Sequence, residues 1–295
     1  MHFSKMIVNG NRILIVEEQA VLNQECDASC IMKKVLGHEF GASCDQAVIY
    51  KSLDKRCMYS VIFYNDDGSR AGMCGNGVCC LGKFLHSITG ITEFEFLIAE
   101  RIVKVTVSDN SCRANLGNAN FNNSMLLYNT ATSINMIKDT VADFLYENNM
   151  PSFDEIFSIG ISFVDFGNPH VILLSETKVA ENYLEKIMLN VGSKIENLQC
   201  FKDRANVSFG YISDGTINLF VWERGSGYTG ACGSGSCATV AALHKLKNIN
   251  KDKMYKIQQR AGNSNVYILK DGSVTLETFP VFCFSGEFSH PCWME

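Results

Sequence analysis

Two cysteines occupy nearly identical surroundings at distant points of this sequence of 295 residues. Cys74 is followed by Gly-Asn-Gly and Cys232 by Gly-Ser-Gly, and each segment continues as an apolar run with helical spacing. A cysteine on a glycine turn at the start of a helix meets backbone N–H groups and the positive end of the helix dipole, which favour a thiolate. Two such thiols suggest a pair that acts on one substrate.

Two thiols on opposite sides of one carbon can invert that carbon, because one removes a proton from one face while the other delivers a proton to the opposite face. The α-hydrogen of an amino acid is a far weaker acid than a thiol, so preorganised donors must stabilise the developing negative charge. Helix N-termini provide such donors, and a substrate carboxylate fits there. The amides concerned are those of Gly75, Asn76, Gly233 and Ser234. These residues are therefore candidate substrate contacts.

Other uses of the two cysteines remain open on residue types alone. A redox disulfide requires only that the thiols approach each other, and a single nucleophilic cysteine could use His170 as its base. Both cysteines could also be small buried residues in glycine turns. None of these uses explains why a set of polar residues recurs together with the cysteines.

That recurrence is a long-period repeat. Residue numbers differ by 158 between Cys74 and Cys232, and by the same amount between Asn65 and Glu223, each nine residues before its cysteine. Two further polar pairs recur at offsets of 157 and 160, namely Asn11 with Asn168 and Gln46 with Asn206. We infer two similar half-molecules, with their polar loops and both cysteines meeting in the cleft between them.

The elements that would position these residues follow the same repeat. In the first half we expect helices at 18–36 and 77–87, and strands at 3–6, 12–17, 44–50, 59–64, 94–99, 102–107 and 112–116. In the second half we expect helices at 133–148, 177–196 and 235–246, and strands at 159–164, 170–174, 205–212 and 216–222, with a strand-like end over 266–284. The Asn-rich stretch 117–133 connects the two halves, so we expect the first half to end near residue 120.

Composition excludes several classes of partner. A content of 46% hydrophobic and 19% charged residues is typical of a globular protein. A net charge of −5 without a dense Lys/Arg run gives no reason to expect nucleic acid or an anionic membrane surface. No run approaches the ~18 apolar residues of a membrane span, and the start lacks the pattern of a signal peptide. We expect a soluble cytoplasmic protein with a small-molecule substrate.

The thirteen cysteines point to thiols in a reducing compartment, since their number is odd and their spacing irregular. No C-x-x-C pair occurs, and Cys26-x-x-x-Cys30 lacks a second ligand pair, so no metal site is expected. Gly225-x-Gly227-x-x-Gly230 matches a dinucleotide-binding pattern, but the helix starts only past Cys232 and the neighbouring strands read as antiparallel. We therefore do not expect a dinucleotide cofactor.

Taken in order, the motifs closely resemble those of the diaminopimelate epimerase family, whose members need no cofactor. The matching segments are Phe3–Met6 with Gly10-Asn11, Asn65–Ser69, Cys74–Gly77, Gly167–His170, Asn206-Val207, Glu223–Gly225 and Ala231–Gly235. They span almost the whole chain. An ordered set of this length is highly specific.

The resemblance implies an α+β fold of two pseudo-symmetric halves, each a β-barrel-like antiparallel sheet wrapped around a central helix, with the active site in the cleft between them. The N-terminal half would be 1–120, with 279–295 returning to it, and the C-terminal half 121–278. The implied reaction interconverts LL- and meso-diaminopimelate, on the route to lysine and to peptidoglycan precursors. The resemblance implies neither pyridoxal phosphate nor a metal, and it suggests a homodimer.

Residue roles carry over from the same resemblance. Cys74 and Cys232 would be the acid/base pair, with Glu223 and His170 beside the reacting centre. The remaining side chains would bind the substrate: Asn11, Gln46, Asn65, Asn168, Asn206 and Arg224. Of these, Arg224 would be the charge-assisted partner of the distal carboxylate.

The sequence departs from the family pattern at three places. Val78-Cys79-Cys80 stands where the family usually has an arginine, Tyr228 stands at a usual glutamate, and the segment 40–45 lacks a usual glycine. Relatives of the family include racemases of other amino acids and isomerases without the cysteines. A racemase or epimerase of another amino acid that needs no pyridoxal phosphate is thus the alternative, and a thiol-switch or small-molecule binding protein is the non-enzyme alternative.

Overall fold

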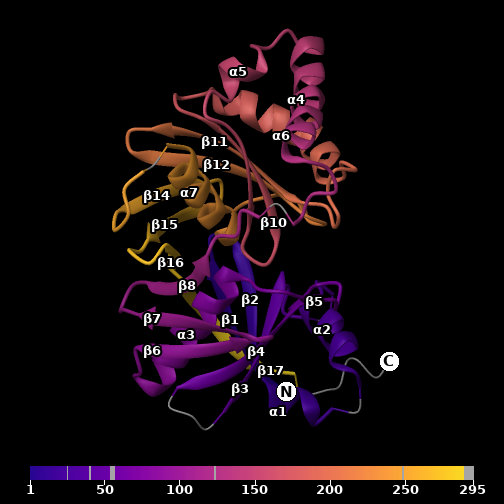
Figure 1. Cartoon of the computed structure of the whole chain (residues 1–295). Helices are drawn as coiled ribbons and strands as arrows, with labels where there is room; N and C mark the ends of the chain where they lie inside the picture. Colours follow the sequence, from indigo (N-terminus) through magenta and orange to yellow (C-terminus); the bar gives the residue numbers. More distant parts are fainter. Residues whose placement is uncertain (25, 40, 54–56, 123, 248, 289–295) are drawn as a thin grey trace. The chain divides into compact units, whose positions relative to one another are not determined.

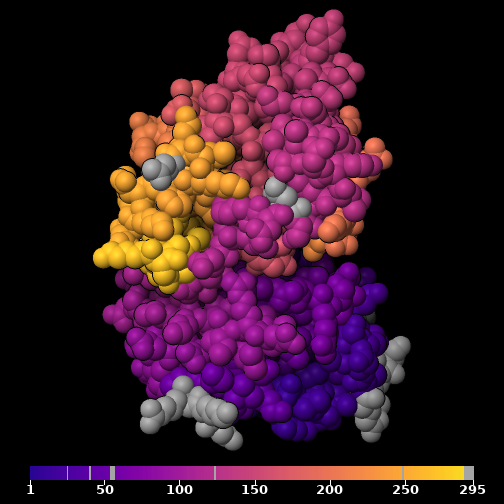
Figure 2. Space-filling model, viewed as in Figure 1, coloured from indigo at the N-terminus to yellow at the C-terminus, as the bar shows by residue number. Residues whose placement is uncertain are grey.

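The chain forms two compact units (Figure 1). The computed structural model describes every residue except 25, 40, 54–56, 123, 248 and 289–295. Unit 1 comprises Met1–Leu116 and Leu276–Glu295, and unit 2 comprises Gly117–Thr275. The chain therefore enters unit 2 once and leaves it once. Figure 2 shows the surface of the chain from the same side, with its atoms drawn as spheres.

Unit 1 is built mainly of strands. They are β1 (His2–Val8), β2 (Asn11–Glu17), β3 (Gln46–Ser52), β4 (Met58–Asn65), β5 (Arg70–Ala71), β6 (Glu93–Ile98), β7 (Arg101–Val107), β8 (Cys112–Asn118, which runs on into unit 2) and β17 (Val281–Glu287). Strand β17, in yellow in Figure 1, pairs with β1 although the two lie at opposite ends of the sequence. Alternation of apolar and polar residues favours a strand with one buried face. In β7, Val103, Val105 and Val107 are buried while the residues between them are exposed.

Helix α3 (Gly75–Thr89) is the central helix of unit 1, and it contacts β1, β2, β3 and β7. The backbone of the helix packs closely against side chains of the sheet. A Cβ at Gly77 would lie 2.8 Å from the ring of Phe63, and one at Gly82 would lie 2.8 Å from Val105. Only glycine fits at these two positions. The helix ends at Gly90, which has the left-handed φ of 73° typical of a C-terminal cap.

The helix expected over 18–36 is wrong as one helix. The structure has α1 (Glu18–Leu22) and α2 (Ala28–Leu36) instead. The physical reason is the side chain of Asp27, which accepts a hydrogen bond of 3.0 Å from the N–H of Ser29 and so caps the start of α2.

Unit 2 repeats this plan. Its strands are β9 (Gly160–Asp165), β10 (Pro169–Ser175), β11 (Asn206–Ser213), β12 (Thr216–Glu223), β13 (Gly227–Thr229), β14 (Met254–Gln259), β15 (Gly262–Ile268) and β16 (Ser273–Thr278, which runs on into unit 1). Its helices are α4 (Thr130–Glu147), α5 (Phe153–Ile156), α6 (Glu181–Glu196) and α7 (Gly233–Lys247). Helix α7 is buried from Ser234 to Leu243, so it is the central helix here.

Strand pairing reveals the pseudo-symmetry. In unit 1, β1–β2 is antiparallel, β2–β3 parallel, β3–β4 and β4–β5 antiparallel, β4–β6 parallel and β6–β7 antiparallel. Unit 2 shows the same succession of pairings over β9 to β15. Register agrees as well, because Ile13 pairs with Gln46 across β2–β3 and His170 pairs with Asn206 across β10–β11. The fold is thus the expected α+β fold of two pseudo-symmetric halves, and the strand pairings given above include two parallel pairs in each half.

Several short elements were not expected from the sequence, namely α5, β5, β13 and β14. The strand-like end expected over 266–284 is three strands. Gly272 interrupts it with a φ of 88° in the turn between β15 and β16, and Pro280 separates β16 from β17. The helix expected from residue 177 begins at Glu181.

Within the described residues, no helix combines the length and the apolar character needed to cross a membrane.

Candidate active site

In unit 1, Cys74 stands at the N-terminus of the central helix. It is the N-cap residue of α3, and its Sγ accepts a hydrogen bond of 3.3 Å from the N–H of Gly77. The sulfur therefore lies at the positive end of the helix dipole and satisfies one of the N–H groups that a helix start leaves without an intrahelical partner. This arrangement stabilises negative charge on the sulfur.

In unit 2, Cys232 has the equivalent place at the start of α7. Its Sγ accepts a hydrogen bond of 3.4 Å from the N–H of Gly235 and lies 3.4 Å from Oγ of Ser234. Cys232 is buried, and burial raises the pKa of this thiol well above its ordinary value. The nearby charge of Glu223 raises the pKa further, while the Ser234 hydroxyl and the Gly235 N–H act in the opposite direction.

The polar residues of unit 1 lie at the ends of the strands next to Cys74. Asn11 Nδ2 is 4.0 Å from Cys74 Sγ, and Gln46 Nε2 donates a hydrogen bond of 3.0 Å to Asn65 Oδ1. Three side-chain oxygens of the candidate residues are buried and find no hydrogen-bond partner among the described residues: Asn11 Oδ1, Gln46 Oε1 and Asn76 Oδ1. A buried acceptor without a donor is costly, so these oxygens suit a ligand that brings N–H groups.

In unit 2, His170 is fully buried beside the start of α7. Its Nε2 lies 3.2 Å from Asn168 Oδ1 and 3.1 Å from Ser234 Oγ, and Asn168 Nδ2 donates to the same Ser234 oxygen at 3.2 Å. Burial, with a smaller effect of Arg224, lowers the pKa of His170 to about 3. The imidazole is therefore neutral at physiological pH, and it holds Asn168 and Ser234 in place.

Asn206 ties two loops of unit 2 together. Its Nδ2 donates to the carbonyl of Pro169 at 2.9 Å, and its Oδ1 accepts the backbone N–H of Arg224 at 2.9 Å. The Arg224 guanidinium donates to the carbonyl of Asp203 at 2.8 Å. Beside it, burial raises the pKa of Glu223. The amide of Asn206 is thus used to position Arg224 in this structure.

Each unit therefore contains one of the two cysteines and one set of the candidate residues. Unit 1 holds Asn11, Gln46, Asn65, Gly75 and Asn76 with Cys74, and unit 2 holds Asn168, His170, Asn206, Glu223, Arg224, Gly233 and Ser234 with Cys232.

Two histidines follow the repeat but were not singled out from the sequence. His86 Nδ1 lies 2.7 Å from the carbonyl of Ile91, and His244 Nδ1 lies 2.7 Å from the carbonyl of Ile249. Their numbers differ by 158, so the offset of the cysteines could have found them. Both lie at helix C-termini, and their role is to hold the loop that follows the helix.

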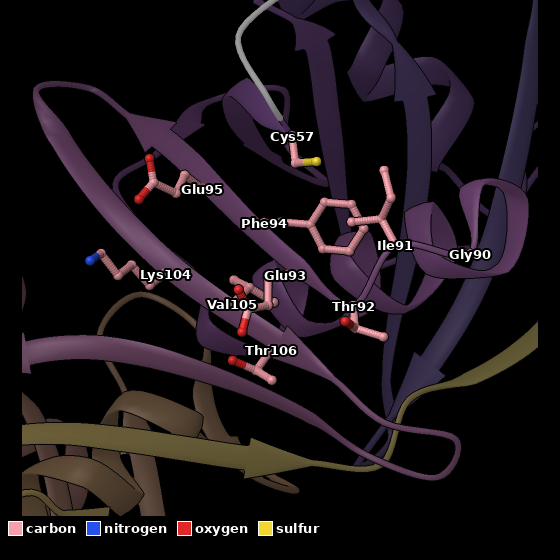
Figure 3. Close-up of a pocket in the computed structure, with 10 residues that line it drawn as sticks. All are labelled: Cys57, Gly90, Ile91, Thr92, Glu93, Phe94, Glu95, Lys104, Val105 and Thr106. Atoms are coloured by element: carbon pink, nitrogen blue, oxygen red, sulfur yellow. The ribbon is translucent and has the colours of Figure 1, made fainter.

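A cavity of about 620 Å³ opens elsewhere in unit 1, over β6, β7 and the loop before them (Figure 3). Its charged lining residues are Glu93, Glu95 and Lys104, and none of the candidate site residues lines it. No group of three or more His, Cys, Asp or Glu side chains that could hold a metal ion occurs in the part of the chain that the structure describes.

Sequence comparisons match this chain to one family of enzymes. The family model for diaminopimelate epimerase matches residues 162–281. The diaminopimelate epimerase of Rickettsia typhi is 30% identical over 298 residues, covering 98% of this chain and 97% of its own. That of Rickettsia bellii (strain OSU 85-389) is 33% identical over 247 residues, covering 83% of each chain.

Solved structures show the same fold at low identity. A phenazine biosynthesis protein of the PhzF family from Bacillus anthracis has a TM-score of 0.72 at 12% identity, over 98% of this chain and 99% of its own. A hydroxyproline epimerase from Agrobacterium vitis has a TM-score of 0.62 at 13% identity, over 97% and 91%. The fold and its relatives define an isomerase that works without pyridoxal phosphate. On the identity and coverage of its relatives, the chain belongs to the diaminopimelate epimerase family.

The charge of Glu223 gives a testable effect on Cys232. Since this charge raises the pKa of the thiol, Glu223→Gln lowers that pKa and enlarges the thiolate fraction at a given pH. We expect iodoacetamide to modify Cys232 several-fold faster at pH 8 in this variant, measured on the Cys232 peptide by mass spectrometry. The control is Glu181→Gln, at the first residue of α6, which should keep the wild-type rate of Cys232 alkylation. An unchanged rate in Glu223→Gln would contradict the assignment.

Proposed function

We propose that this protein interconverts LL- and meso-diaminopimelate by inverting one Cα, with Cys74 and Cys232 as the two acid/base groups. The observation that carries the proposal is their equivalence, because each sulfur accepts the N–H three residues on, at the start of a central helix. Membership of the family supports the substrate. The product would serve lysine and peptidoglycan precursor synthesis.

The reaction requires one thiolate and one thiol on opposite faces of the same carbon. The thiolate takes the α-proton as the C–H bond breaks, and the S–H bond of the other cysteine then breaks as its proton reaches the opposite face. One cysteine ends as a thiol and the other as a thiolate, so the protons balance. The backbone amides of Gly75, Asn76, Gly233 and Ser234 would hold the substrate carboxylate and stabilise the carbanion.

The polar residues suit an amino acid with two zwitterionic ends. The unpartnered oxygens of Asn11, Gln46 and Asn76 can accept hydrogen bonds from an ammonium group. Asn65 would join these contacts, and Arg224 would pair with the distal carboxylate. In unit 2, Asn168 and Asn206 would complete the contacts to the substrate. This division of donors and acceptors favours diaminopimelate over a substrate with one apolar end.

Glu223 and His170 would tune the site rather than carry the inversion. Burial and, after it, the charge of Glu223 raise the pKa of the Cys232 thiol, so this sulfur would stay protonated in the resting enzyme. His170 stays neutral, because its pKa is lowered to about 3, so it can orient its neighbours without adding a charge. Both residues would lie beside the reacting centre.

Two features support the remaining parts of the proposal. The cysteines in the described part of the chain form no disulfides, which agrees with a reducing cytoplasm.

Strand β17 pairs with β1 and exposes Val281, Phe282 and Phe284. Apolar side chains on a strand next to solvent are a typical contact for another chain, and we assign that chain as a second copy of this protein.

The assigned reaction is tested with the purified protein and LL-diaminopimelate, without added pyridoxal phosphate or metal. We expect conversion to a mixture of LL and meso isomers, separated by chiral chromatography. No conversion, with inversion of proline or hydroxyproline instead, would replace the assignment by a racemase of another amino acid. A lack of inversion on every amino acid would favour a binding or thiol-switch role.

Removal of either sulfur tests the two-base mechanism. We expect Cys74→Ala and Cys232→Ala each to lower kcat by about a thousandfold or more, since each takes away one proton-transfer group. Cys79→Ala is the matched control, because this thiol is buried on the same helix as Cys74 and faces the carbonyl of Cys112. Substantial turnover in either active-site variant would rule the mechanism out.

The homodimer is tested by sedimentation velocity. A chain of 32.8 kDa should sediment with twice that mass. Phe282→Lys should give the monomer, because a charge replaces an apolar side chain in the contact, whereas Tyr146→Lys on the exposed face of α4 should leave the dimer intact. A wild-type monomer, or a dimer that Phe282→Lys leaves unchanged, would count against this interface.

A further inference from the structure

Glu196 is a buried carboxylate that the steps above do not use. It is the last residue of α6, and its side chain is only 5% exposed. Three donors converge on it. Trp222 Nε1 donates to Oε2 at 2.7 Å, while the backbone N–H of Gly225 and Arg204 Nη1 each donate to Oε1 at 2.9 Å. Both carboxylate oxygens are therefore engaged in strong, charge-assisted hydrogen bonds.

Two of these donors enclose the functional dipeptide of unit 2. Trp222 comes directly before Glu223 and Arg224, and Gly225 comes directly after them. The Glu196 carboxylate thus fixes the chain on both sides of Glu223 and Arg224. Glu223 lies near Cys232, and Arg224 is the proposed partner of the distal carboxylate of the substrate. Gly225 has a φ of 80°, a conformation that glycine adopts without strain, so the turn brings its N–H to Glu196.

Gly192, one helical turn before Glu196, adds a packing contact to this clamp. A Cβ at Gly192 would lie 2.8 Å from two carbons of the Trp222 indole, so only glycine permits the approach. Residues four apart lie on the same helix face. The indole therefore packs on Gly192 while its N–H bonds to Glu196, which leaves Trp222 a single orientation.

Unit 1 has a counterpart of different chemistry. The turn after β4 is held by Ser29 of α2, whose Oγ donates to the carbonyl of Gly68 at 2.6 Å. In both units a helix between the second and third strands of the repeat fixes the loop after the fourth strand. Among the residues that the structure describes, a buried carboxylate has this role in unit 2 alone, where the loop carries Glu223 and Arg224.

We propose that Glu196 is a positioning residue that sets Glu223 beside Cys232 and Arg224 at the substrate. It touches no reacting atom and acts through the two residues that it brackets. The proposal rests on the proposed function for the roles of these two residues. Its placement of Glu223 can also be measured without turnover.

The first test is kinetic, with Glu196→Gln and LL-diaminopimelate. The carboxamide keeps the shape of the side chain, but its NH₂ group must face at least one of the three donors, so the clamp loosens. We expect kcat/KM to fall by about tenfold or more, with a rise in KM as Arg224 loses its place. Trp222→Phe removes the indole donor and part of the packing on Gly192, but it leaves the bonds from Gly225 and Arg204 to Glu196 in place, so it should cause a smaller loss.

The matched control is Glu181→Gln, at the start of the same helix. Glu181 accepts a hydrogen bond of 2.9 Å from the hydroxyl of Tyr211, so this variant also removes a carboxylate that bonds an aromatic donor. It is distant in sequence from the 222–225 turn and should keep wild-type kinetics. The thermal midpoint of each variant shows whether the protein is folded at the assay temperature.

The second test reads Glu223 directly through the alkylation of Cys232. If Glu196 places Glu223, then Glu196→Gln speeds the reaction of Cys232 with iodoacetamide in the same direction as Glu223→Gln. The double variant should then react no faster than Glu223→Gln alone, because both changes act through one group. Additive effects would mean that Glu196 only loosens the fold.

These outcomes separate the two proposals. An inactive wild-type protein that still shows the non-additive alkylation pattern would overturn the epimerase assignment and support the positioning role. An active protein in which Glu196→Gln has wild-type kinetics and a wild-type alkylation rate would overturn the positioning role and leave the epimerase assignment standing.

Discussion

The hydrogen bond from a helix N–H to a cysteine sulfur is the interaction on which the rest of this structure depends. It occurs twice, from Gly77 to Cys74 and from Gly235 to Cys232, at 3.3 and 3.4 Å. A helix start offers unpaired N–H groups and a positive dipole end, so a sulfur placed there can hold negative charge that it would not hold in an apolar core. Each central helix is buried, and its sheet is wrapped closely enough that Gly77 cannot be replaced without a clash.

The two half-sites are equivalent in backbone and different in chemistry, and this asymmetry suits a reaction that needs one base and one acid. Around Cys74 the side chains are amides, some with oxygens that lack donors among the described residues. Around Cys232 lie a carboxylate, a neutral imidazole and a hydroxyl, and burial and charge together raise the pKa of that thiol. A sulfur that keeps its proton is suited to deliver it.

The two-fold repeat of the structure and the two cysteine sites could be predicted from the sequence. The repeat is visible there because cysteines, glycines and amide residues typical of loops and helix starts recur at a nearly constant offset. The offset of Cys74 and Cys232 corresponds to strands that pair in the same succession in both units, so one distance in sequence reflected the whole architecture. The break at Asp27 was missed, although a capping residue marks it, because apolar spacing continues through it. Glu196 was missed for a different reason. In a sequence, a charged residue at the end of an amphipathic helix is expected to be exposed to solvent. The folded chain brings Trp222 and Gly225 to Glu196, and no local sequence pattern indicates these contacts.

The most direct test of the central claim is the fate of the α-hydrogen in heavy water at low conversion. The protein is incubated with LL-diaminopimelate in D₂O, and both isomers are analysed by mass spectrometry and proton NMR before equilibrium is approached. Two thiols on opposite faces predict that the meso product carries deuterium at the inverted carbon while the remaining LL substrate keeps its hydrogen. A product that retains the original hydrogen, or substrate that gains deuterium as fast as product forms, would show that a single base serves both faces and would contradict the account.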